Sequence, residues 1–287
     1  MRLIRKLIFT LIGIVGFIAI LVVGGYIFVR TTYDIDLFNT VGQLRTLNQK
    51  VDEAKLCPNA FTTDDMASAK TVINSSVANM ITYTEEEGYR INLNGITSPM
   101  TSEIRLTDKQ VGALANLIVQ QELDGKITIN NKDCSLTVLQ VTFSNVDNGS
   151  VTFNTTVKID ITPLKKDMTS FPYSYVSGYV PNYLYVSSTV DVKKESTAFT
   201  YTVSHNNITL NNLNSEDTED LFHTLDTVAK IGSAKDLNES IGNIVTNTLI
   251  GNENNSGIAY ALKSIGATDY NFIQDSEINY FVIEYII

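Results

Sequence analysis

Tryptophan is absent from this sequence, and cysteine and histidine occur only twice each. So few metal-binding side chains exclude a zinc ribbon, and so few cysteines exclude a disulfide-dense module. Lysine and arginine total 21 against 31 aspartates and glutamates, which gives a formal net charge of −10. Because a generic nucleic-acid binder needs a basic face, we expect no nucleic-acid partner.

Motifs of the common enzyme classes are also missing. The sequence has no Gly-x-Ser-x-Gly nucleophile elbow, no Ser-x-x-Lys with its partner motifs and no glycine-rich phosphate loop. The two histidines, His205 and His223, are not at metal-ligand spacing, so a metal site would have to come from scattered residues. We therefore expect a protein that is not an enzyme and that uses no metal or cofactor.

Apolar residues, by contrast, make up 44% of the chain, which excludes wholesale disorder. They are concentrated first in an uncharged run over 7–29, which contains no proline. At about 1.5 Å per residue, this run is long enough to cross a hydrocarbon core of roughly 30 Å. Arg2, Arg5 and Lys6 precede it, and such cationic flanks stay in the cytoplasm.

We therefore predict a basic cytoplasmic N-terminus at 1–6, a single-pass transmembrane helix at 7–29 in the plasma membrane, and an extracytoplasmic C-terminal domain. A cleaved signal peptide is the alternative, but its apolar region would be shorter and a small-x-small site would follow it.

Beyond Arg30 the chain has 17 basic residues against 31 acidic ones, a net charge of −14. Such a domain repels anionic lipid headgroups unless it presents local basic spots.

Apolar residues at three- and four-residue steps predict a helix over 36–54, which would form a juxtamembrane stalk over 30–58. Pro58 disfavours helix at the residue before it and ends this segment. A second helix is expected from Thr63 to about Ile81, and a Thr107–Gln110 capping box opens a third that runs to about Leu123.

Long strands are expected next, over 126–130, 136–144, 151–161, 184–192 and 199–203. The apolar set shifts phase between Val138 and Leu139, which indicates a bulge or a strand buried on both faces. Helices return from Ser215, from Asn238 or Ser240, and over 258–265. A final strand at 278–287 is apolar on both faces and belongs in the middle of a sheet. The expected fold class is α+β, with a long-stranded antiparallel sheet and flanking helices over 59–287.

Two local features bear on a binding site. Export permits a disulfide between Cys57 and Cys134, which would pin the stalk to the sheet; two inert thiols are the alternative. Residues 171–185 hold six aromatic side chains, and aromatic loops form pocket mouths, sugar-stacking surfaces or membrane-touching tips, or else cover a sheet edge. We place the entrance to an apolar ligand site at this loop and its interior on the last strand: Tyr173, Tyr175 and Tyr179 at the entrance, Phe281 and Ile283 deeper inside.

The basic N-terminus, the single span, the run Leu-Thr-Asp-Lys-Gln-Val-Gly-Ala-Leu-Ala-Asn-Leu at 106–117 and the long strands after it resemble one family. This family comprises the YpmS-like membrane-anchored extracytoplasmic proteins of low-GC Gram-positive bacteria. The resemblance covers 1–30 and 100–287 in layout and only 106–117 in residues. It implies no catalytic residues, and its long curved strands are similar to those of lipid-carrying tubular folds.

Two function classes follow from these features. The first is a membrane-anchored extracytoplasmic binding protein that holds a lipid or another apolar envelope ligand. The second is a non-enzymatic adaptor or scaffold protein of the cell-envelope machinery, with other envelope proteins as its partners. A continuous apolar cavity would favour the first class, and a packed sheet with a flat surface patch would favour the second.

Overall fold

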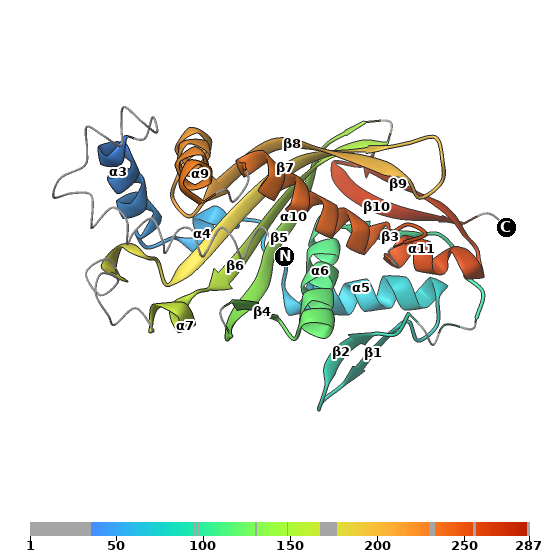
Figure 1. Ribbon diagram of the computed structural model, residues 1–287. Coiled ribbons are helices and arrows are strands. Elements are labelled where there is room, and N and C mark those ends of the chain that lie inside the picture. The colour runs from blue at the N-terminus through green and yellow to red at the C-terminus, as the bar shows by residue number, and fades with distance from the viewer. Residues whose placement is uncertain are drawn as a thin grey trace.

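The structure is a computed structural model, described for residues 36–93, 96, 98–129, 131–147, 149–166, 177–229, 233–254 and 257–285. It is an elongated α+β molecule in which long strands run from the end formed by α3 toward the end formed by β9 and β10 (Figure 1). The predicted transmembrane helix at 7–29 lies outside the described residues. Within the residues that are described, no helix is long and apolar enough to cross a membrane.

The larger sheet has five antiparallel strands, and each pairs with its neighbour in sequence, which confirms the predicted long-stranded antiparallel sheet. The pairing of β5 with β6 shifts register between Val138 and Gln140, so Leu139 is the extra residue of the predicted bulge. Asp147 pairs with Ser150, and Gly149 between them has a φ of 85°. The strands are β4 (Lys126–Ile129), β5 (Lys132–Asp147), β6 (Ser150–Asp160), β7 (Tyr183–Lys194) and β8 (Tyr201–Leu210).

A second sheet has three strands in the order β3 (Ile104–Thr107), β10 (Ile278–Tyr285) and β9 (Ala267–Asp275). The last strand is therefore central, as its two apolar faces predict. Ring contacts join the two sheets, because Phe272 of β9 packs edge-on against Phe143 and Phe153 of the larger sheet. Phe281 extends this cluster at 5.4 Å from Phe272.

Helices α6 (Asp108–Leu123) and α10 (Ala234–Leu249) cross one face of the larger sheet (Figure 1). The Thr107–Gln110 capping box opens α6 as predicted. By contrast, α10 begins at Ser233, which forms a capping box with Asp236, and not at Asn238 or Ser240. The other helices around the sheets are α5 (Thr63–Ser76), α7 (Thr162–Lys165), α9 (Ser215–Ala229), α11 (Ile258–Ala261), and the 3-10 turns η1 (Ser177–Tyr179) and η2 (Leu262–Ile265).

Two carboxamide side chains hold the ribbon formed by β1 (Ile81–Thr84) and β2 (Gly88–Ile91). Asn74 of α5 bonds both backbone polar groups of Ile81, and Gln121 of α6 does the same for Ile91. Ile81 and Ile91 are opposite each other in the ribbon. Each amide thus replaces the neighbouring strand that an isolated two-stranded ribbon lacks.

The segment predicted as a juxtamembrane stalk is instead part of the domain. It forms two helices, α3 (Leu37–Leu47) and α4 (Glu53–Leu56), and not one continuous helix over 36–54. Leu44 and Leu47 of α3 are buried in the common core, where α3 packs against α9. Part of the apolar stripe that predicted the helix is therefore covered by the domain itself.

Cys57 and Cys134 are free, buried thiols in the structure, so the disulfide alternative is not what this fold contains. The Cys57 thiol is hydrogen-bonded to Thr156 of β6. Cys134 lies on the same face of β5 as Leu136 and Val138, and Val138 pairs with Val157 of β6, so Val157 is on that face too. Thr156 and Val157 are adjacent on β6, so the two thiols lie on opposite faces of the sheet. Burial raises the pKa of both thiols.

We therefore predict that two thiols titrate when the full chain is unfolded in denaturant without a reductant. In the native protein both should react slowly with a thiol reagent, because each is buried and has a raised pKa. Reaction with Ellman's reagent measures both states. Absence of titratable thiol in non-reducing denaturant would show that the chain forms a disulfide after all.

Candidate functional site

The residues predicted to line one apolar site do not come together in the described part of the structure. Phe281 and Ile283 are fully buried within the core, and Tyr179 is partly exposed in η1. Phe153 packs in the same ring cluster as Phe281 and pairs with Val190 of β7. Val190 lies seven residues after the first residue of that strand, a distance of about 23 Å along the strand, so this cluster is far from the end of the aromatic segment. Tyr173 and Tyr175 lie outside the described residues, so their part of the entrance stays a prediction.

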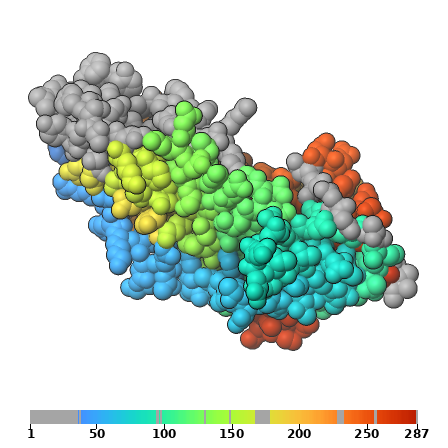
Figure 2. Space-filling view, turned by 90° about the horizontal axis from the view of Figure 1, so that it is seen from below, coloured from blue at the N-terminus to red at the C-terminus, as the bar shows by residue number. Residues whose placement is uncertain are grey.

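An open cleft does lie beside the end of the aromatic segment, and we call it the lysine–tyrosine cleft. It has a volume of about 520 Å³ and is lined by residues of the 48–53 and 181–185 segments together with Lys165 and Asn211. Tyr183 and Tyr185, the last two aromatic residues of the predicted loop, form part of its wall. In Figure 2, the blue chain that follows residue 36 lies beside the yellow-green strands at this end.

One carboxylate fixes the 48–53 segment onto the sheet. Glu53 Oε1 accepts hydrogen bonds from Lys158 Nζ and from Tyr185 Oη, both at 2.6 Å. Lys158 Nζ also lies 4.5 Å from the centre of the Tyr183 ring. The bonds from Lys158 and Tyr185 lower the pKa of Glu53, while burial and the bond to Glu53 raise the pKa of Tyr185 to about 12. Glu53 is therefore ionised, and Lys158 already neutralises its charge.

Two other cations of the cleft have no carboxylate partner among the described residues. Lys165 Nζ donates to the amide oxygen of Asn182 at 2.9 Å, and burial lowers its pKa. Lys50 is exposed at the rim. The cleft therefore presents two lysines that have no carboxylate partner in the described part of the chain, an amide and aromatic walls, within a strongly acidic domain. Ammonium groups in this setting suit an anionic ligand group such as a phosphate.

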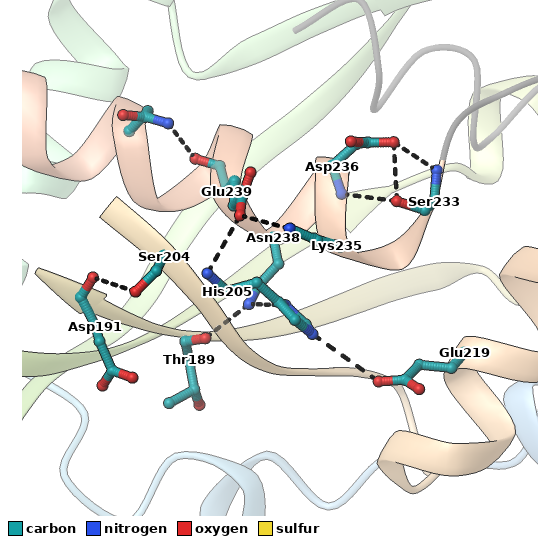
Figure 3. Close-up of polar contacts among 11 residues, drawn as sticks. Thr189, Asp191, Ser204, His205, Glu219, Ser233, Lys235, Asp236, Asn238 and Glu239 are labelled. Carbon is teal, nitrogen blue, oxygen red and sulfur yellow. Dashed lines mark hydrogen bonds and ion pairs between the residues drawn. The ribbon is translucent and has the colours of Figure 1, made fainter. Parts of the chain in front are cut away.

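A second polar cluster surrounds His205 of β8 and is shown in Figure 3. The fully buried Asn238 of α10 accepts a hydrogen bond from Ser188 and donates from Nδ2 to Thr189 O and His205 Nδ1, both at 2.7 Å. Because a carbonyl oxygen only accepts, the amide nitrogen must face Thr189, and His205 Nδ1 must accept as well. His205 Nδ1 is therefore the acceptor in its contact with Asn238.

This cluster joins α10 to the sheet. His205 Nε2 lies 3.9 Å from Glu219 of α9, beside a small cleft of about 310 Å³ that also includes His223. Across the described residues, neither histidine is hydrogen-bonded to a hydroxyl or thiol side chain that could act as a nucleophile. No three described His, Cys, Asp or Glu residues are grouped so that they could hold a metal ion.

Neither a family model nor a curated protein matches this sequence. A crystal structure of lipopolysaccharide binding protein aligns with 65% of this chain and 41% of that chain, at 14% sequence identity. Its TM-score is 0.19, too low for the similarity to support any argument about fold or ligand.

We predict that Asn238→Ala lowers the free energy of unfolding by about 2–4 kcal/mol, because it leaves one buried and two partly buried polar groups without their partner. Asn243→Ala is the matched control, since Asn243 is exposed on the same helix and should change stability by less than about 0.5 kcal/mol. Urea unfolding of the full chain, followed by circular dichroism, measures both. Equal stability of the two variants would contradict the role given to Asn238.

Proposed function

We propose that this chain is a membrane-anchored extracytoplasmic binding protein that recognises the phosphate-bearing headgroup of an anionic envelope lipid. The binding site is the lysine–tyrosine cleft. The observation that carries this proposal is the pair Lys50 and Lys165, which line an open cleft without a carboxylate partner among the described residues. Each charged hydrogen bond from such a lysine to a phosphate contributes roughly 1.5–3 kcal/mol.

The expected anchor supports a ligand that belongs to the membrane. The predicted transmembrane helix ends at residue 29, and α3, which follows it, is about 16 Å long. The cleft begins directly after α3, at Asn48. A headgroup in the outer leaflet is therefore within reach of the site without leaving the bilayer.

Packing favours recognition of a headgroup over storage of an acyl chain. Phe281 and Ile283, which were expected to line an apolar interior, are fully buried among neighbouring core residues. The lysine–tyrosine cleft is open and has polar as well as aromatic walls. The ligand's apolar chains would remain in the membrane, and the protein would hold only the polar end.

The test is titration calorimetry of the full chain in neutral detergent with three probes. These are dioctanoyl phosphatidylglycerol, dioctanoyl phosphatidylcholine and inorganic phosphate. We expect phosphatidylglycerol to bind and phosphatidylcholine to bind far more weakly. The double variant Lys50→Gln/Lys165→Gln should weaken phosphatidylglycerol binding by about tenfold or more, since two charged contacts are lost.

Lys193→Gln is the control, because Lys193 is an exposed lysine at the far end of β7 and should bind like the unchanged protein. Tight binding of inorganic phosphate alone would identify a soluble anion as the ligand. Equal binding of phosphatidylglycerol by the double variant and the control would reject the cleft and leave the adaptor function in its place.

A further inference from the structure

The lysine–tyrosine cleft is larger than the phosphate that its lysines are proposed to bind. Its volume of about 520 Å³ falls within the range of roughly 300–1,000 Å³ that is typical of pockets for whole small molecules. A phosphate bound by Lys50 and Lys165 would fill only a small part of this volume. The other walls of the cleft therefore indicate which group is attached to the phosphate.

One of these walls includes the aromatic ring of Tyr183, which is fixed in place and accessible. Asn211 is buried, and its amide nitrogen donates to Tyr183 O at 3.1 Å while its amide oxygen accepts from Tyr185 N at 2.7 Å. Lys158 Nζ lies over one face of the Tyr183 ring, 4.5 Å from its centre. Tyr183 is nevertheless 42% exposed and lines the cleft, so ring surface remains for contact with a ligand.

Two carboxamide side chains accompany this ring. Asn182 is anchored because its backbone oxygen accepts from Ile161 N at 2.9 Å. Its side-chain oxygen accepts from Lys165 Nζ, and its amide nitrogen has no hydrogen-bond acceptor among the described residues. Gln49 on the opposite wall is exposed, and its side-chain amide bonds to no described residue. Because amides both donate and accept, these two side chains suit hydroxyl groups, which do the same.

An accessible ring with amides beside it fits a six-membered sugar. The faces of such a sugar consist largely of C–H groups, which pack on aromatic rings, and its rim carries hydroxyl groups. A choline headgroup fits less well, because Lys158 neutralises Glu53 and the two cleft lysines repel a quaternary ammonium. A glycerol headgroup has no ring face to place on Tyr183.

We propose that the anionic lipid recognised by the cleft is glycosylated, with a sugar linked through the phosphate that Lys50 and Lys165 bind. The C–H face of the sugar packs on Tyr183, and its hydroxyl groups bond to Asn182 and Gln49. This inference deepens the proposed function and rests on it, since it assigns the second part of the same headgroup.

Two lipids that differ only in the group on the phosphate test this assignment. They are dioctanoyl phosphatidylglucose and dioctanoyl phosphatidylglycerol, which have the same charge and the same acyl chains. Titration calorimetry of the full chain is done in a polyoxyethylene detergent, because a glycosidic detergent would itself compete for the site. We expect phosphatidylglucose to bind about tenfold more tightly, since it adds a ring contact and hydrogen bonds.

Three variants show whether the ring carries this preference. Tyr183→Leu keeps an apolar side chain without the ring, so it should lose about fivefold of the preference and bind phosphatidylglycerol as before. Tyr183→Phe keeps the ring and should keep the preference. Tyr83→Leu is the matched control, since Tyr83 is a similarly exposed tyrosine on the β1–β2 ribbon, away from the cleft (Figure 1). Circular dichroism checks that each variant is folded.

The outcomes separate this inference from the proposed function. Equal binding of the two lipids by the unchanged protein would overturn the sugar assignment and leave the proposed function intact. An unchanged preference in Tyr183→Leu would also overturn the assignment, because the ring would then not be the contact. Binding of neither lipid would reject the proposed function itself, and the sugar assignment with it.

Discussion

The bonds from Lys158 and Tyr185 to Glu53 hold the α4 end of the 48–53 segment on the sheet. They attach α4 to β6 and β7 and so place the 48–53 segment opposite Tyr183 and Tyr185. They also neutralise the negative charge of Glu53, so that Lys50 and Lys165 remain without a carboxylate partner among the described residues. Asn48 and Gln49 at the start of this segment are held separately, by hydrogen bonds to Gly178 O and from Asn212, so the Glu53 contact fixes the end of the segment at α4.

The rest of the molecule provides a rigid support for that end. The ring cluster of Phe143, Phe153 and Phe272 joins the two sheets, and the Asn238 network joins α10 to the larger one. Both are fully packed or fully bonded, so they contribute stability and leave little space for a ligand. The open lysine–tyrosine cleft, by contrast, lies at the surface.

Local chemistry was enough to predict the long strands, the bulge at Leu139 and the Thr107 cap, because alternation and capping depend on nearby residues. The strand β9 was missed because its turn into β10 uses Ser276 and Glu277 at positive φ, where asparagine or glycine is the usual signal. The prediction of one stalk helix over 36–54 was wrong, because an apolar stripe indicates that one face of a helix is buried but not which part of the protein covers it. Of the cleft, only the lining residues between 181 and 185 lie in the aromatic segment. Glu53 and Lys165 are distant from it in sequence, as is Lys158, which bonds Glu53, and these residues meet only through folding.

Native mass spectrometry of the full chain, extracted from a bacterial membrane in mild detergent, tests the central claim most directly. The account predicts that a phosphate-bearing anionic lipid is retained by the protein and by Lys193→Gln, and is lost from Lys50→Gln/Lys165→Gln. Lipid-free protein, or the same lipid retained by all three chains, would contradict it.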